Sequence, residues 1–199
     1  MTAYSVVVIG TSWGGLAALT TLLGCLPADY PIPIAVVQHR SKEAERLLPQ
    51  LLQDVTALKI CEMDDKDPLL PGTVHLAPAD YHALIDTGMV TLTVEDPVRF
   101  SRPSIDLLFM SAADTYRECT VGIVLTGANE DGSRGLQHIV KRGGHAIVQD
   151  PKTAEVPTMP AAAIKAVPSA EVLPLEGITA RLIELALEPS HTHRRRTPR

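Results

Sequence analysis

Short runs of consecutive apolar residues alternate along this chain with longer stretches in which apolar residues recur every three or four positions. The first run, at residues 6–9, is rich in β-branched residues and predicts a buried strand. The stretch at 16–26 has leucines at helical spacing and stops at Pro27, so it predicts a helix. The same two patterns predict further strands at 34–37, 121–125, 145–149 and around Val172, and further helices at 43–55, 105–116, 133–142, 161–166 and 179–187.

This alternation of strands and helices is typical of an α/β fold with a doubly wound, mostly parallel sheet and helices on both faces. Ser104 is the expected N-cap of the helix that follows it. The middle of the chain differs, because turn residues at 71–72 and 86–88 separate short β-like segments. There we expect an antiparallel hairpin extension at one edge of the sheet. The segments lie at 59–62, 73–77, 81–85 and 90–94.

Composition narrows the class of protein without changing the fold prediction. The chain has 199 residues, of which 45% are hydrophobic, and this suits one domain, expected at 1–189. The last ten residues, 190–199, carry four arginines and are expected to form a disordered basic tail. The net charge of −5 argues against a nucleic-acid-binding protein.

The cysteines and the hydropathy of the chain predict a cytoplasmic location. Cys25, Cys61 and Cys119 are odd in number and form no Cys-x-x-Cys pair, which is typical of proteins from a reducing compartment. The chain opens without a signal-peptide pattern, and no apolar run reaches about 18 residues. We therefore expect no membrane insertion.

The turn between the first strand and the first helix is the first candidate for chemistry. Gly10, Gly14 and Gly15 surround a single hydroxyl, that of Ser12. In a parallel sheet this turn lies at the carboxyl edge, where ligands bind. The free N–H groups of the helix end would favour either a developing negative charge beside a nucleophile or a bound phosphate. The turn alone leaves both functions open.

Other polar residues follow other strands at the same edge. His39, Asp131 and Asp150 each come directly after a predicted strand, as Ser12 does. A serine, a histidine and an aspartate together form a nucleophilic triad, in which the histidine takes the serine proton and the aspartate orients the imidazole. Each of these residues also has a structural explanation, such as a turn aspartate bonded to its own backbone. Spacing alone does not choose between Asp131 and Asp150.

Nucleotide-binding motifs are absent from the turn. The glycines do not form Gly-x-Gly-x-x-Gly, position 39 is a histidine where a dinucleotide fold has an acidic residue, and no Gly-Lys-Ser/Thr follows. The segment 10–14 does have Gly-x-Ser-x-Gly spacing, but the chain order serine, histidine, aspartate differs from that of α/β-hydrolases. A different lineage of serine hydrolases is therefore indicated.

The sequence resembles the catalytic domain of the chemotaxis protein-glutamate methylesterases, the CheB family. The similarity runs in family order over nearly the whole chain, from about residue 5 to residue 187. The matching motifs are Ile9-Gly10-Thr11-Ser12-Trp13-Gly14-Gly15, Gln38-His39, Leu70-Pro71-Gly72, Leu76-Ala77-Pro78, Arg102-Pro103-Ser104-Ile105-Asp106-Leu107-Leu108-Phe109, Leu125-Thr126-Gly127, Asp131-Gly132 and Met159-Pro160.

The resemblance implies a triad of Ser12, His39 and Asp131, and so prefers Asp131 over Asp150. It implies hydrolysis of glutamate methyl esters on the cytoplasmic domains of methyl-accepting chemotaxis receptors, with release of methanol, and deamidation of receptor glutamines. The backbone N–H groups of Trp13 and Ala128 would bind the oxyanion. The resemblance implies no metal and no cofactor.

Three departures from the family pattern bear on substrate and regulation. Trp13 stands where the family commonly has threonine, and Ala128 stands where it commonly has methionine. The family usually carries a phosphorylatable receiver domain before the catalytic one, whereas this chain reaches its first strand by Val6. We therefore expect a stand-alone form, regulated through a separate response-regulator protein. The alternatives are an esterase for a different substrate and a catalytically silent module that binds an anion or a partner.

Overall fold

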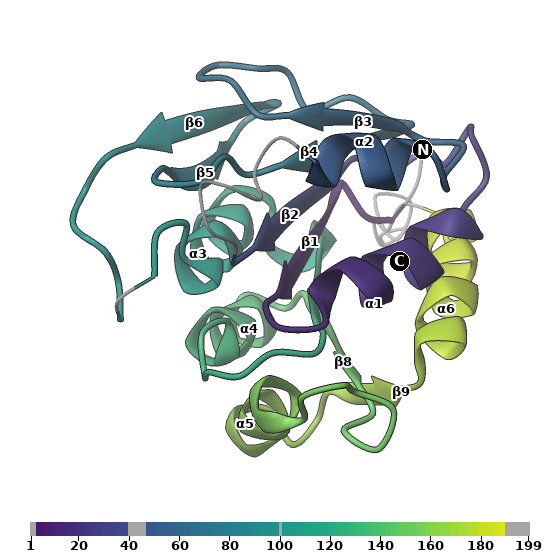
Figure 1. The fold of residues 1–199 in the computed structure, drawn as a ribbon, viewed down its shortest axis with the longest axis vertical. Helices are drawn as coiled ribbons and strands as arrows, with labels where there is room; N and C mark the ends of the chain where they lie inside the picture. The colour runs from purple at the N-terminus through teal and green to yellow at the C-terminus, as the bar shows by residue number, and fades with distance from the viewer. Residues whose placement is uncertain (1–2, 40–46, 100, 190–199) are drawn as a thin grey trace, which may run out of the picture.

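A seven-stranded sheet runs through the centre of the molecule (Figure 1). The computed structural model describes residues 3–39, 47–99 and 101–189. The strand order is β3-β4-β2-β1-β7-β8-β9, and every neighbouring pair is parallel. The strands are β1 (Val6–Thr11), β2 (Ile34–Gln38), β3 (Lys59–Glu62), β4 (Thr73–Leu76), β7 (Thr120–Val124), β8 (His145–Gln149) and β9 (Glu171–Leu173).

Helices cover both faces of the sheet, because alternate residues of the strands point to opposite sides. In β1, Val6 and Val8 belong to one hydrophobic cluster and Val7 and Ile9 to another. The first cluster includes residues of α3 (Ile105–Tyr116), α4 (Ser133–Lys141) and α5 (Thr158–Ala166). The second includes residues of α1 (Gly15–Gly24), α2 (Leu48–Gln53) and α6 (Leu175–Leu187). The predicted α/β fold with a doubly wound sheet is therefore confirmed.

The predicted hairpin is present as a separate sheet of two antiparallel strands, β5 (His82–Asp86) and β6 (Met89–Thr93). It is held against α3, since Ile85 N–H donates to Ser111 Oγ at 2.9 Å and Thr115 Oγ1 donates to Ile85 O at 3.0 Å. The preceding two β-like segments differ from the expectation. They form β3 and β4, which are parallel strands of the main sheet at its edge.

Several helices begin or end away from their predicted residues. Within the predicted helix at 43–55, α2 begins at Leu48 with Pro49 in its first turn, where a missing N–H costs no hydrogen bond. Residues 43–46 lie outside the described residues, as does the predicted tail at 190–199. Helices α5 and α6 each begin about one turn earlier than their apolar patterns predicted. None of the helices in the part of the chain that the structure describes is long and apolar enough to cross a membrane.

The strand order creates a switch point at the middle of the sheet. From β1 the chain moves to β2 on one side, and it later returns to β7 on the other side of β1. Because all seven strands are parallel, their carboxyl ends lie at one edge, and ligands of such folds bind where the order reverses. Ser12 follows β1 and Asp131 follows β7, so the predicted site residues flank this switch point.

Helices α3 and α4 approach each other closely at Gly135. A Cβ at this position would lie 2.9 Å from the carbonyl oxygen of Asp106 and 2.6 Å from Phe109 Cβ. We expect Gly135→Ala to lower the free energy of unfolding by a net of about 2 kcal/mol, because overpacking of about 3 kcal/mol exceeds a gain in helix propensity of about 1 kcal/mol. Urea denaturation measures this change.

Arg134→Ala is the control for this prediction, because Arg134 is an exposed residue of the same helix. It should change the free energy of unfolding by no more than about 0.5 kcal/mol. Equal stability of Gly135→Ala and the wild type would show that the two helices are not in tight contact there.

Candidate active site

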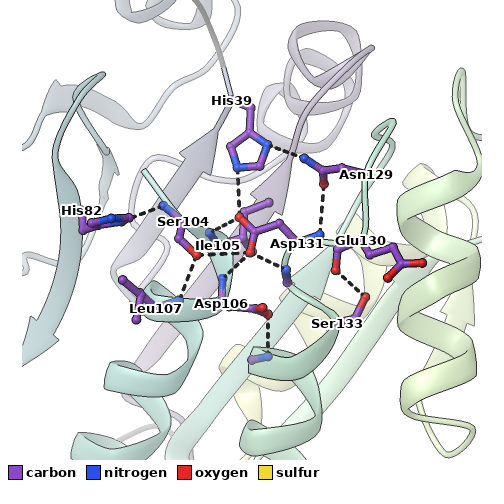
Figure 2. A network of polar contacts seen from close by, with 12 residues as sticks. His39, His82, Ser104, Ile105, Asp106, Leu107, Asn129, Glu130, Asp131 and Ser133 are labelled. Carbon is purple, nitrogen blue, oxygen red and sulfur yellow. Dashed lines mark hydrogen bonds and ion pairs between the residues drawn. The ribbon is translucent and has the colours of Figure 1, made fainter. Parts of the chain in front are cut away.

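The carboxylate of Asp131 is the buried centre of a hydrogen-bond network at the switch point (Figure 2). It accepts hydrogen bonds from Ser104 Oγ at 3.2 Å and from the backbone N–H groups of Ile105 at 2.8 Å, Asp106 at 3.0 Å and Gly132 at 3.0 Å. Two of these N–H groups belong to the first turn of α3, where free N–H groups favour negative charge. The helix end therefore stabilises the ionised carboxylate of Asp131.

Two neighbouring carboxyl groups are shifted in opposite directions. Burial raises the pKa of Asp131, but hydrogen bonds from His39, Asp106 N–H and Ile105 N–H outweigh it and hold the pKa below its usual range. Burial raises the pKa of Asp106; its hydrogen bond from Gly135 N–H opposes that rise and the charge of Asp131 adds to it. Asp131 is thus the more acidic of the two carboxyl groups.

His39 follows β2 and contacts Asp131 through one ring nitrogen, with 3.0 Å between Nε2 and Asp131 Oδ2. An ionised carboxylate can only accept a hydrogen bond, so Nε2 carries the proton and Nδ1 is the acceptor of the neutral ring. Nδ1 lies 3.2 Å from Asn129 Nδ2. The other end of that amide, Asn129 Oδ1, accepts a hydrogen bond from Asp131 N–H at 3.0 Å.

Ser12 and His39 are the residues that directly follow two adjacent strands, β1 and β2. Thr11 of β1 pairs with Gln38 of β2, and His39 N–H donates to Thr11 O at 3.1 Å. Since parallel strands lie about 4.8 Å apart, Ser12 and His39 leave the sheet side by side. Gly127 packs against the serine, because a Cβ there would lie 3.0 Å from Ser12 Cβ. The two predicted residues therefore share one rim with Asp131, and the hydrogen bond between His39 and Asp131 is formed.

An open hollow of about 570 Å³ lies at Ser12. Trp13 is 66% exposed on its rim, and its indole N–H donates to Glu155 Oε1 at 3.0 Å. Gln38 also lines the hollow; within the described residues its buried Oε1 has no hydrogen-bond partner. Gly14, with a φ of 77°, is the N-cap of α1, so the hollow lies at a helix N-terminus, as the sequence predicted.

The network extends from Asp131 to the hairpin through residues that sequence analysis did not assign to the site. Ser104 N–H donates to His82 Nδ1 at 3.1 Å, and His82 Nε2 donates to Asp96 O at 3.2 Å. Ser104 was expected only as an N-cap, which it is, since its Oγ accepts from Leu107 N–H at 3.5 Å. The Ser104 hydroxyl thus accepts the capping hydrogen bond of α3 and donates one to Asp131, so it links the start of α3 to the site.

Asp150, the other candidate aspartate, lies in a turn of its own after β8. Its Oδ1 accepts from Lys152 N–H at 3.0 Å, and its backbone bonds to Leu173 and Thr153. These contacts are local to that turn and the neighbouring strand end, so the structural explanation suits Asp150. Across residues 3–39, 47–99 and 101–189, no group of three or more His, Cys, Asp or Glu side chains is arranged to hold a metal ion.

Comparison with known proteins identifies the family of this chain. The family profile described as CheB methylesterase matches residues 7–182. The chain belongs to the CheB methylesterase family. A solved structure, the CheB methylesterase catalytic domain of Thermotoga maritima, superposes with a TM-score of 0.87 at 34% identity, covering 92% of this chain and 98% of that one.

Curated members of the CheB methylesterase family differ in length. A putative protein-glutamate methylesterase/protein-glutamine glutaminase of Leptospira interrogans is 42% identical over 183 residues, covering 92% of this chain and 95% of the relative. The protein-glutamate methylesterase FrzG of Myxococcus xanthus is 37% identical over 182 residues, covering 91% of this chain and 54% of the relative. The family resemblance inferred from motifs is thus confirmed.

The lowered pKa of Asp131 predicts a dependence of stability on pH. An unfolded aspartate has a pKa of about 3.9, so around pH 4 the unfolded chain binds more protons at this residue than the folded chain does. The stabilisation is complete above about pH 5 and is lost as the pH falls through the lower folded value. Asp131→Asn places an amide NH₂ group among N–H donors. It should lower the free energy of unfolding by about 1–3 kcal/mol at pH 7 and by less at pH 3.

Urea denaturation of the wild type and Asp131→Asn at both pH values measures this difference. Asp150→Asn is the matched control, because its carboxylate accepts a hydrogen bond only within its own turn. It should change the free energy of unfolding by no more than about 0.5 kcal/mol. A loss for Asp131→Asn that is equally large at pH 3 and pH 7 would contradict the assigned charge.

Proposed function

We propose that this chain is a serine hydrolase that removes methyl esters from glutamate side chains of methyl-accepting chemotaxis receptors. The observation that carries the proposal is the 3.0 Å contact between His39 and Asp131, with Ser12 on the adjacent strand at the same rim. A serine, an imidazole and an ionised carboxylate in this order are the components of acyl transfer through a covalent intermediate. The similarity to proteins named protein-glutamate methylesterase supports the same reaction.

In the proposed mechanism Ser12 Oγ attacks the ester carbonyl carbon while His39 Nδ1 takes the hydroxyl proton. Asp131 keeps the proton on Nε2 and stabilises the imidazolium that forms. When the carbon–oxygen bond to the methoxy group breaks, His39 returns its proton and methanol leaves. Water, deprotonated by His39, then hydrolyses the acyl-enzyme to the free glutamate and regenerates Ser12. With a glutamine side chain the same sequence releases ammonia.

The proposed oxyanion donors are the backbone N–H groups of Trp13 and Ala128. Trp13 follows the nucleophile at the start of α1, and Ala128 lies in the loop that carries Asp131. A backbone donor does not depend on side-chain identity, so the changes from threonine and methionine leave the oxyanion site intact. The change at Trp13 alters the wall of the hollow instead, where its exposed indole and the carboxylate of Glu155 would meet the substrate.

The proposed partners are the cytoplasmic domains of chemotaxis receptors, and the proposed location is the cytoplasm. Regulation would come from a separate response-regulator protein. The net charge of −5 supports a protein substrate over a nucleic acid.

The test of this function is Ser12→Ala. Without the nucleophile, methanol release from methylated receptor fragments should fall by at least about 10⁴-fold, because removing one member of such a triad costs rate factors of this order. A serine-directed fluorophosphonate should label the wild type at Ser12 and should not label the variant. Circular dichroism should show an unchanged fold.

Ser169→Ala is the matched control, because Ser169 is an exposed serine in the turn before β9 and so lies at the amino edge of the sheet. It should retain wild-type methanol release and labelling. Retention of methanol release by Ser12→Ala would rule out the proposed nucleophile.

A further inference from the structure

The ring nitrogen of His39 that must accept the serine proton is already occupied in this structure. Figure 2 shows the imidazole between two partners, with Asp131 on Nε2 and the Asn129 amide on Nδ1. The distance from Asn129 Nδ2 to His39 Nδ1 is 3.2 Å. This contact is not part of the proposed triad, and it involves the atom on which general-base catalysis depends.

The direction of this hydrogen bond follows from the partners at either end. The carboxylate of Asp131 requires the ring proton on Nε2, so Nδ1 presents a lone pair. Asn129 Oδ1 accepts the backbone N–H of Asp131, so the amide must point its Nδ2 toward the ring. Asn129 Nδ2 therefore donates to His39 Nδ1, and every group in the chain of contacts is used consistently.

A neutral imidazole has a single acceptor nitrogen, so Asn129 and Ser12 compete for it. While the amide N–H occupies Nδ1, the hydroxyl of Ser12 cannot donate there. Once Nδ1 has taken a proton, both Nδ1 and the Asn129 amide nitrogen are hydrogen-bond donors. Contact between the two N–H groups is then unfavourable. The arrangement needed for catalysis therefore requires the Asn129 side chain to leave.

The position of Asn129 permits such a movement. Asn129 is half-buried and lies between two exposed residues, Ala128 and Glu130. Rotating its side chain breaks two hydrogen bonds, to His39 Nδ1 and to Asp131 N–H. An incoming ester brings carbonyl oxygens that can accept the released amide N–H.

We propose that Asn129 restrains the free enzyme by occupying His39 Nδ1, and that binding of the glutamyl ester displaces it. The inference rests on the proposed function, because the restraint matters only if His39 is the base for Ser12. On this proposal Asn129 is a positioning residue that acts through His39 and slows the reaction. The alternative is a supporting role, in which the amide would hold the imidazole in its catalytic orientation.

Two substitutions separate the restraint from a structural role. Asn129→Ser is too short to reach His39 but keeps a side-chain oxygen that can accept Asp131 N–H within the turn. Asn129→Ala removes both hydrogen bonds. If Asn129 restrains the base, both variants should react with a fluorophosphonate about 2- to 10-fold faster than the wild type, the factor expected from one net hydrogen bond. With a methylated receptor fragment, KM should fall by the same factor at unchanged kcat.

The ¹⁵N resonance of His39 Nδ1 gives a readout that does not depend on turnover. In the free wild type it should report an unprotonated nitrogen that accepts a hydrogen bond, and in both variants it should move downfield as that bond is lost. Labelling of either variant at the wild-type rate or slower overturns the proposal. So does a loss of rate in Asn129→Ala that Asn129→Ser restores, because that pattern identifies support of the turn.

Failure of the proposed function gives a different result. In that case the wild type would release no methanol and would not be labelled at Ser12, while the resonance of His39 Nδ1 would still show its bond to Asn129. The restraint proposal would then fall with the function, although the contact itself would be verified.

Discussion

The buried negative charge of Asp131 is the constraint on which the arrangement of the site depends. A carboxylate removed from water must be compensated by donors, and here they come from the first turn of α3, the Ser104 hydroxyl and the ring of His39. These donors belong to two separate segments of the chain, and Asp131 itself lies in a third. Solvating one ion therefore joins the loop after β7, the start of α3 and the end of β2, and His82 extends the connection to the hairpin.

The same charge decides which nitrogen of His39 can take part in chemistry. Because Asp131 holds the proton on Nε2, all the basicity of the neutral ring is at Nδ1. The loop that supplies Asp131 also supplies Asn129, which contacts Nδ1 from the other direction. In the proposed mechanism this one short loop therefore both orients the base and limits access to it, because Asn129 bonds to the ring of His39 and to the backbone of Asp131.

Much of the fold could be predicted from sequence because the signals are local. Apolar runs predicted the strands on either side of the switch point, and their parallel pairing places Ser12, His39 and Asp131 at one edge. The orientation of β3 and β4 could not be predicted in this way. They are connected without a helix, and they join the main sheet because β4 pairs with β2 and β3 pairs with β4. Helix α5 begins at Thr158, with Pro160 in its first turn, and α6 begins at Leu175, directly after Pro174.

The residues around the triad were harder to predict, because their roles come from partners far away in the sequence. Asn129 looks like an ordinary turn residue, and its Oδ1 does bond two residues ahead, but its Nδ2 contacts a ring 90 positions earlier. From the sequence alone His82 is only a histidine in a strand. Its connection to the site becomes visible only through the hydrogen bond that Ser104 N–H donates to it. Sequence patterns locate reactive groups at the ends of strands. Which hydrogen-bond donors compete for the lone pair of such a group depends on side chains that only folding brings together. A motif match can therefore identify a nucleophile and its base and still leave open whether the base is free to act.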